Sequence, residues 1–299
     1  RASISCNSRM ASKTGPNASS SNMTDLGRYK GKFWICWGIL PLLIGCGSKQ
    51  RHAQQEFVGR MSTVNAMDSA TQPKVETFPQ RLIAAYPDHL SAFEGNDIIW
   101  KDGSRMPWDD GQAGKTFAEL EANADLEDMF VFDYPAGEAV FKENFDPGRI
   151  RNEAFFKKMY GETATLVEAN LVSVPWFGSK IRVTKVNGVD KALEKVAQEL
   201  QSLPELKKYL ETPGGGQYWR VIAGTPRLSA HSFGIAVDIN TAFTDYWRWG
   251  SEFKQGKPLV YRNRIPLEIV EIFEKSGFIW GGKWYHYDTM HFEYRPELL

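Results

Sequence analysis

Cysteine is absent from the chain after Cys46, and all three cysteines precede residue 47. The rest of the chain can therefore form no disulfide, and a metal ion there would be held by histidine, aspartate or glutamate. A charge excess is absent as well, because Lys+Arg and Asp+Glu both number 36. Binding to nucleic-acid phosphates needs a basic excess or stripe, so this balance argues against nucleic acid as the main partner. The hydrophobic content of 42% and the aromatic content of 13% indicate a globular protein with a sizeable core.

The apolar run near the start of the chain is short. It covers residues 33–45, FWICWGILPLLIG, after a basic flank, whereas a membrane-spanning helix needs about 20 apolar residues. A basic flank before a short apolar core is typical of a signal peptide. Residues 43–46, LIGC, resemble a bacterial lipobox, which implies cleavage before Cys46 and lipid attachment to it. We therefore expect a lipoprotein of the cell envelope, located in the periplasm or otherwise outside the cytoplasm and anchored to a membrane by its lipid. An uncleaved anchor or a buried hydrophobic segment is the alternative.

Composition divides the chain into four segments. Residues 1–46 comprise non-native or leader residues together with the signal peptide, and the polar residues 47–72 indicate a flexible tether. Residues 73–180 are predicted to be an N-terminal elaboration packed on the same domain. Residues 181–299 are predicted to form the core of that domain.

Hydrophobic periodicity predicts the elements of the core. IRVTKVN at 181–187 alternates apolar and polar side chains, as a strand does. Apolar residues recur every three or four positions between residues 189 and 211, which predicts a helix, and Pro204 is expected to begin a second short helix. Further predicted elements are a strand at 218–224, an amphipathic helix at 265–277, closing strands in FIWGG and MHFEY, and an acidic helix with a solvated face at 118–129.

Two stretches, SAHSFGIAVDIN and YHYDTMHFEY, concentrate the residues that can carry chemistry. They contain His231, Asp238, Asp288 and His291, in a chain with only five histidines. Alternation along the predicted strands turns Asp238 and His291 away from the apolar face. If the two strands pair, His231 can join them around one metal ion, and Asp288 leans over the site from the preceding turn. A lone buried histidine is more often a hydrogen-bonded core residue, but the two stretches together favour a metal site.

These stretches resemble the zinc D-alanyl-D-alanine carboxypeptidases and the related L-alanyl-D-glutamate endopeptidases, which share the hedgehog/D,D-peptidase fold. The family signature is S-x-H-x-x-G-x-A-x-D, followed later by an acidic residue three positions before a second histidine. The matching residues are Ser229, His231, Gly234, Ala236 and Asp238 in the first part and Asp288 and His291 in the second. The resemblance covers mainly residues 218–299. It implies an α+β fold in which a small antiparallel sheet with flanking helices carries the zinc site.

The resemblance also implies roles for individual residues. His231, Asp238 and His291 would be the ligands of Zn2+, and Asp288 would be the general base for attack by a zinc-activated water. The family uses an arginine to hold a substrate carboxylate or the developing oxyanion, and Arg220 is the first candidate for that role. Arg227 and Arg182 are the alternatives for this arginine. Further candidates for substrate binding are Arg227, Ser229 and His286.

The substrate implied by the resemblance is a peptidoglycan stem peptide. Members that cut D-Ala-D-Ala commonly carry Glu at the position of Asp288, which favours the L-Ala-D-Glu endopeptidases here. A D-Ala-D-Ala carboxypeptidase stays open. The alternative function is a catalytically inactive zinc-binding or wall-binding lipoprotein module. Asp288 argues against that alternative, because a binding module has no use for a base beside the metal.

Overall fold

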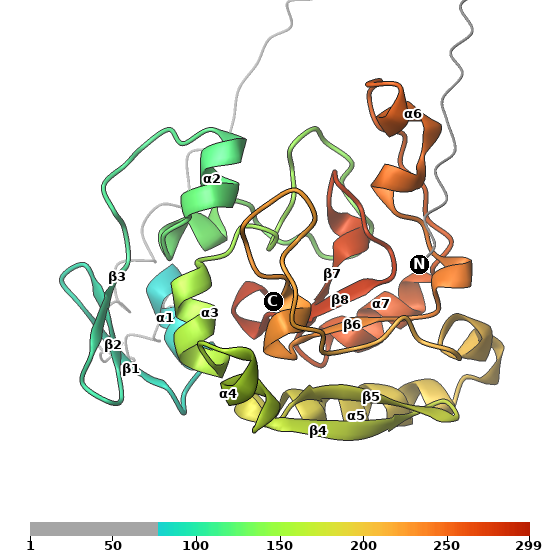
Figure 1. Ribbon diagram of the computed structural model, residues 1–299, viewed down its shortest axis with the longest axis horizontal. Helices are drawn as coiled ribbons and strands as arrows, with labels where there is room; N and C mark the ends of the chain where they lie inside the picture. Colours follow the sequence, from blue (N-terminus) through green and yellow to red (C-terminus); the bar gives the residue numbers. More distant parts are fainter. Residues whose placement is uncertain (1–76) are drawn as a thin grey trace, which may run out of the picture. The chain divides into compact units, whose positions relative to one another are not determined.

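The structure, a computed structural model, describes residues 77–299 (Figure 1). The predicted signal peptide, the lipidation site Cys46 and the predicted tether lie outside the described residues. Within residues 77–299, none of the helices is both long and apolar enough to cross a membrane.

Helices and small antiparallel sheets make up the described part of the chain. The helices are α1 (Phe78–Ala85), α2 (Phe117–Asn123), α3 (Glu153–Tyr160), α4 (Ala164–Glu168), α5 (Val189–Gln201), α6 (Ser251–Lys254) and α7 (Leu267–Glu274). The sheets combine β1 (Leu90–Glu94), β2 (Asp97–Trp100) and β3 (Arg105–Pro107); β4 (Leu171–Trp176) and β5 (Ser179–Thr184); and β6 (Ala236–Asp238), β8 (His291–Tyr294) and β7 (Phe278–Trp280). The α+β fold class expected from the sequence is confirmed.

Strand β8 lies at the centre of the sheet built from the two motif stretches. It pairs antiparallel with β6 on one side and with β7 on the other. The register sets Asp238 opposite His291 and Val237 opposite Phe292. Val237 and Phe292 are fully buried, and the Phe292 ring stacks on Phe273 of α7 with the ring centroids 3.8 Å apart. Because side chains alternate along a strand, Asp238 and His291 lie side by side on the other face.

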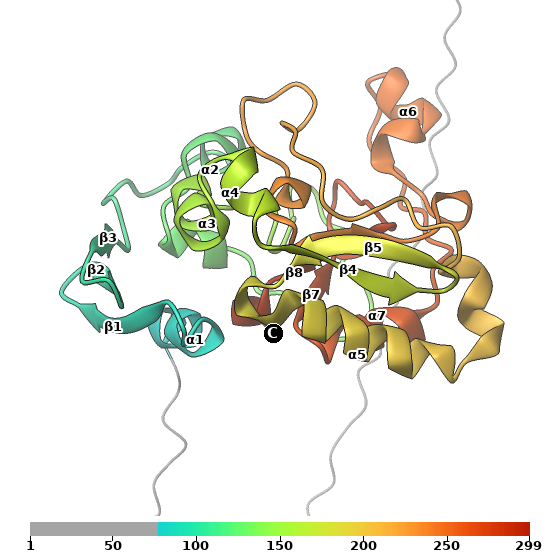
Figure 2. The ribbon, with the colours of Figure 1, turned by 60° about the horizontal axis from the view of Figure 1, so that its bottom comes forward.

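Helix α7 covers the apolar face of this sheet, and helix α5 packs against α7. α7 contacts β7, and α5 contacts both α7 and β4. Figure 2 shows α5 running along the hairpin of β4 and β5. The buried residues of α5 recur at the three- and four-residue spacing that predicted the helix. Helix α7 therefore lies on the face of the sheet opposite to Asp238 and His291.

The boundaries of two predicted elements shift. β5 ends at Thr184 rather than at residue 187, because Asn187 and Gly188 take left-handed backbone conformations that lead into α5. The helix predicted over 189–211 divides after α5, and Pro204 begins a 3-10 helix as expected.

The prediction of a strand at 218–224 is wrong. This segment folds back on the residues that follow it to form a hairpin of residues 219–229, in which the Ile222 N–H donates to the Arg227 carbonyl at 2.8 Å. Gly224, with φ of 83°, allows the reversal at the tip. Backbone groups of the hairpin form hydrogen bonds within it and with Ser232, so the segment does not join the sheet.

The N-terminal part of the described chain shares the hydrophobic core of the metal-site sheet. Tyr86, which follows α1, donates a hydrogen bond to Glu297 near the C-terminus at 2.7 Å. Phe156 of α3 packs against Phe233, with the ring centroids 5.9 Å apart. The segment predicted as an elaboration therefore contacts the motif region directly, while the domain boundary at residue 180 stays a prediction.

Candidate metal centre

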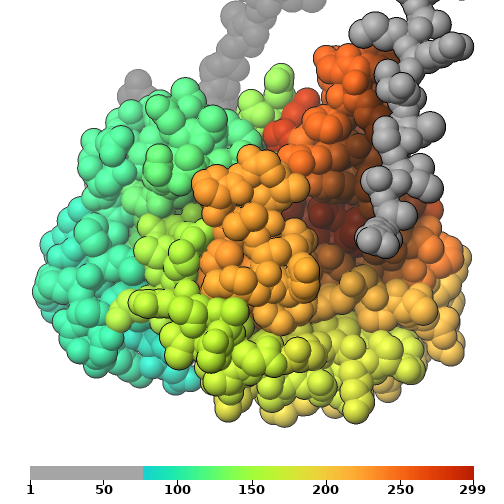
Figure 3. Space-filling view, in the orientation of Figure 1, coloured from blue at the N-terminus to red at the C-terminus, as the bar shows by residue number. Residues whose placement is uncertain are grey.

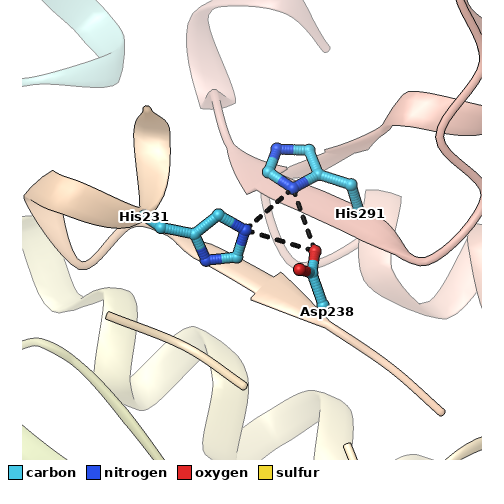
Figure 4. Close-up of side chains that lie close together, drawn as sticks. All are labelled: His231, Asp238 and His291. Atoms are coloured by element: carbon cyan, nitrogen blue, oxygen red, sulfur yellow. Dashed lines mark hydrogen bonds and ion pairs between the residues drawn. The ribbon is translucent and has the colours of Figure 1, made fainter. Parts of the chain in front are cut away.

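Three side chains from three elements meet on the polar face of the sheet (Figure 4). His231 lies in a short 3-10 helix, Asp238 ends β6 and His291 begins β8. His231 Nε2 lies 3.2 Å from both His291 Nδ1 and Asp238 Oδ1. His291 Nδ1 lies 3.1 Å from Asp238 Oδ1. The structure thus brings the three predicted ligands together, each with one donor atom facing a common centre.

Gly234 makes this convergence possible. Its φ of 71° turns the chain from the 3-10 helix of His231 back into β6. A Cβ at this position would lie 2.9 Å from the backbone nitrogen of Thr184, and that nitrogen donates to the Gly234 carbonyl. Glycine is therefore required both by the backbone conformation and by the close approach of β5.

The donor set fits a divalent metal ion. Ligand atoms held at about 2.0 Å around one tetrahedral ion lie about 3.3 Å apart, close to the distances between these donors. Two imidazoles and one carboxylate are also a ligand set of catalytic metal sites, which keep a fourth position open. We therefore describe His231, Asp238 and His291 as a candidate metal site.

Hydrogen bonds behind the two histidines set their orientation. His231 Nδ1 lies 2.6 Å from the carbonyl oxygen of Gly216, so Nδ1 carries the hydrogen and Nε2 keeps its lone pair for the metal. Gly216 lies so close to β5 that a Cβ at this position would be 2.2 Å from the Arg182 carbonyl oxygen. His291 Nε2 lies 3.4 Å from Glu293 Oε2, which leaves Nδ1 facing the centre.

Glu293 is a buried carboxylate held by two arginines. Arg151 Nη1 lies 3.2 Å from its Oε2, and Arg295 Nη1 lies 3.3 Å from its Oε1. Burial alone would raise the pKa of Glu293, but the charge of Arg151 and the hydrogen bond with His291 lower it to about 2. Glu293 is thus an ionised acceptor that fixes the ring of a metal ligand.

The electrostatic environment favours a cation at the centre. Burial would raise the pKa of Asp238, but the charges and hydrogen bonds of His231 and His291 hold that pKa well below its usual range. Burial would lower the pKa of His291, yet the Asp238 and Glu293 carboxylates raise it to about 10. The carboxylates that favour a proton on His291 also favour a metal ion in its place.

Asp288 lies beside the ligands with an unused oxygen. It precedes β8 in a turn, where its backbone N–H donates to the Gly281 carbonyl at 2.9 Å. Its Oδ1 has no hydrogen-bond partner among the described residues. Burial and then the charge of Asp238 raise the pKa of Asp288 to about 6. A carboxyl group with a pKa near neutrality is suited to exchanging protons with a ligand in the cleft.

The candidate metal site opens into a cleft of about 110 Å³. Figure 3 shows a hollow beside the hairpin of residues 219–229, drawn in orange, with C-terminal residues in red at its floor. The darker orange segment that carries α6 borders the other side. Residues that line the cleft besides the three ligands include Arg149, Arg151, Arg220, Trp247, His286 and Asp288.

The three arginines suggested by the sequence lie in different places. Arg220 lines the cleft, and its side chain forms no ion pair within residues 77–299. Arg227 does not line the cleft and instead pairs with Glu121 at 2.9 Å. Arg182 pairs with Glu168 at the surface of β5. Of these three arginines, only Arg220 is placed to contact a ligand beside the metal site.

Ser229 and His286, the other candidates for substrate binding, both line the cleft. Ser229 is the N-cap residue of the 3-10 helix, although its side chain makes no capping hydrogen bond. His286 Nδ1 lies 2.7 Å from Asp146 Oδ2, and its ring contacts Phe117 and Trp247.

The sequence patterns did not predict that residues 117–151 contribute to the cleft. The acidic stretch 118–129 indicated only a solvated helix face, yet Glu121 of α2 pairs with Arg149 at 3.1 Å. The available signal is the pair of arginines in Arg149-Ile150-Arg151, whose side chains both line the cleft.

A second group of acidic residues, Asp109, Asp110 and Asp125, also lies close together. The Lys115 ammonium lies 2.9 Å from Asp110 and 3.1 Å from Asp125. The Lys115 ammonium already serves as the cation that binds two of these carboxylates, so we assign no metal site to the group.

Replacing Glu293 by glutamine is expected to weaken metal binding by about 10- to 100-fold, because the ionised acceptor behind His291 is lost. Glu297→Gln is the matched control, since Glu297 pairs with Arg295 in the same buried network without touching a ligand. Competition titration against a chelator measures both affinities. An unchanged affinity in Glu293→Gln, or an equal loss in both variants, would contradict this role of Glu293.

A candidate metal site of two histidines and an aspartate, open to a cleft that a further carboxyl group also lines, is typical of metal-dependent hydrolases. Residues 223–294 match the peptidase M15 family model described as D-alanyl-D-alanine carboxypeptidase. This stretch is therefore a metallopeptidase-family domain, and it contains all three candidate ligands together with Asp288. No curated protein matches the chain.

Proposed function

We propose that the protein is a zinc-dependent peptidase that hydrolyses peptidoglycan stem peptides. The observation that carries this proposal is Asp288 Oδ1, which has no hydrogen-bond partner within residues 77–299 and lies beside three convergent ligands in an open cleft. The family match over residues 223–294 supports the same class of substrate. A module that only binds zinc or the wall would have no use for a partly buried carboxyl group with a pKa near neutrality.

Zinc is the ion that we propose for the site. His231, Asp238 and His291 would hold it, and three nitrogen and oxygen ligands with an open fourth position are typical of catalytic zinc. When bound, zinc would polarise the scissile carbonyl and lower the pKa of a water molecule toward about 7.

Asp288 moves the protons in the proposed reaction. Its carboxylate accepts a proton from the attacking water and then donates that proton to the leaving amine. A pKa of about 6 suits both steps, because the group is ionised at neutral pH and still able to hold a proton. Asp238 is unsuited to this task, since its pKa is held well below the usual range.

Arg220 is the cleft arginine that we propose for binding a substrate carboxylate. Arg149 and Arg151 also line the cleft, but Arg149 lies 2.6 Å from Asp146 and Arg151 lies 3.2 Å from Glu293. Their donors are therefore occupied by protein carboxylates. The Arg220 guanidinium, without an ion pair in the described chain, keeps its donors for a ligand.

Replacing Arg220 by alanine is expected to lower kcat/KM by roughly 10- to 100-fold, the loss of a charge-assisted hydrogen bond or two. Arg220→Lys is expected to recover only part of the loss, because lysine lacks the planar fork of donors. Arg182→Ala is the matched control, since Arg182 lies outside the cleft. Steady-state kinetics on a stem peptide measure each variant. An unchanged kcat/KM in Arg220→Ala would show that Arg220 does not bind the substrate carboxylate.

Two bonds of the stem peptide are candidates for cleavage. The matched family model favours release of the terminal D-Ala, whereas aspartate rather than glutamate at position 288 favours cleavage between L-Ala and D-Glu. Mass analysis of purified peptidoglycan digested by zinc-loaded protein distinguishes the two products. If neither fragment appears, the proposed function fails.

We also propose that the enzyme works in the cell envelope, attached to a membrane by lipid on Cys46. The basis is the lipobox-like sequence LIGC at 43–46. Expression of Cys46→Ser is expected to move the protein from the membrane fraction to the soluble fraction and to abolish incorporation of labelled fatty acid. Unchanged labelling in the variant would contradict the anchor.

A further inference from the structure

One histidine of the cleft is held by a buried carboxylate from a distant part of the chain. His286 Nδ1 lies 2.7 Å from Asp146 Oδ2, and the His286 backbone N–H donates to Asp146 Oδ1 at 3.0 Å. Asp146 has a relative exposure of 0%. Both oxygens of this carboxylate therefore bind the same residue, one through its main chain and one through its ring.

Two aromatic side chains restrict the His286 ring further. Phe117 of α2 stacks on it with centroids 5.6 Å apart and an interplanar angle of 25°, and Trp247 meets it edge-on at 4.7 Å. With Nδ1 engaged by Asp146, Nε2 is the ring nitrogen left for the cleft that Asp288 also lines. The contacts come from segments far apart in sequence, so the ring orientation is a property of the folded chain.

Asp146 is held in its ionised form. Burial alone would raise the pKa of Asp146, but the hydrogen bond from His286 and the charge of Arg149, whose Nη1 lies at 2.6 Å, lower it. An ionised carboxylate can only accept a hydrogen bond, so the hydrogen of neutral His286 must sit on Nδ1.

We propose that Asp146 is a positioning residue that fixes His286 in the tautomer with hydrogen on Nδ1 and presents the Nε2 lone pair to an amide N–H of the substrate peptide. The substrate part of this proposal rests on the proposed peptidase function. The tautomer part concerns the free protein and can be tested without substrate.

Nitrogen-15 NMR of histidine-labelled protein tests the tautomer directly. The resonances of His286, assigned with His286→Ala, are expected to show hydrogen on Nδ1 in the wild type. In Asp146→Asn the amide can donate to Nδ1, so the resonances are expected to shift toward the tautomer with hydrogen on Nε2. Hydrogen on Nε2 in the wild type, or no shift in the variant, would overturn the proposal.

A double-mutant cycle tests the link to the substrate. Asp146→Asn is expected to lower kcat/KM roughly tenfold, the loss expected for one misplaced hydrogen bond, and to have no further effect when His286 is already alanine. Asp125→Asn, at another buried aspartate of the N-terminal part, is the control for a purely structural loss. Metal content and thermal unfolding are measured for every variant.

Additive losses of Asp146→Asn and His286→Ala would show that Asp146 acts on the fold and would overturn the proposal. A wild type inactive on every stem peptide would instead defeat the proposed function, and the NMR result would still stand.

Discussion

Replacing Asp288 by asparagine is expected to lower kcat on a stem peptide by about 10²- to 10⁴-fold while the metal stays bound. Asparagine keeps the size of the side chain and removes the carboxyl group that carries the proton. Because Asp288 Oδ1 has no partner among the described residues, the change breaks no hydrogen bond at that atom. Steady-state kinetics together with metal analysis of the purified protein measure the result.

Asp245→Asn provides the matched control for this substitution. Asp245 lies on the segment that pairs with Thr289 next to Asp288, but its carboxylate binds Arg264 and does not line the cleft. Its kcat is expected to stay within about twofold of the wild type, as for an exposed ion pair. If Asp288→Asn retained a comparable kcat, Asp288 would not be the base.

The pH dependence follows from the same carboxyl group. Burial and Asp238 raise the pKa of Asp288 to about 6, and the base must be ionised to accept a proton. Activity is therefore expected to fall as the pH drops through that range, and a bound cation would move the limb to lower pH. The profile of kcat/KM against pH should lose this acid limb in the residual activity of Asp288→Asn.

Replacing His291 by alanine is expected to abolish metal binding at the candidate site and activity with it. His291 contributes one of three donor atoms, and loss of a direct ligand should exceed the 10- to 100-fold effect of losing a residue behind a ligand. The matched control is His89→Ala, since His89 lies outside the cleft lining. Metal analysis after dialysis measures both variants. Full metal occupancy in His291→Ala would show that the ion is held elsewhere.

The parts of the site that the sequence predicted are those set by local geometry. Asp238 and His291 lie on strands, and alternation alone decides which face each side chain takes. Gly234 allows the reversal that returns His231 to the same face. Once β6 and β8 pair in register, Asp238 and His291 lie side by side, and the turn at Gly234 adds His231 to them.

The parts that could not be predicted depend on contacts between distant segments. Asp146 reaches His286 across 140 positions, and Glu121 reaches Arg227 across 106. Nothing in the pattern of either acidic residue distinguishes a buried partner from a solvated charge. The strand predicted at 218–224 fails for a related reason, because the sequence of YWRVIAG does not reveal that the chain reverses at Gly224 and forms hydrogen bonds with the residues that follow.

Zinc add-back to chelator-treated protein distinguishes a zinc peptidase from a binding module. Protein stripped of metal is expected to leave a stem peptide intact, and activity is expected to return and saturate at about one zinc per chain, as one three-ligand site requires. Asp288→Asn loaded with the same amount of zinc is expected to stay inactive. Hydrolysis that persists without metal, or zinc-loaded wild type that binds peptidoglycan and releases no fragment, would contradict the proposed mechanism.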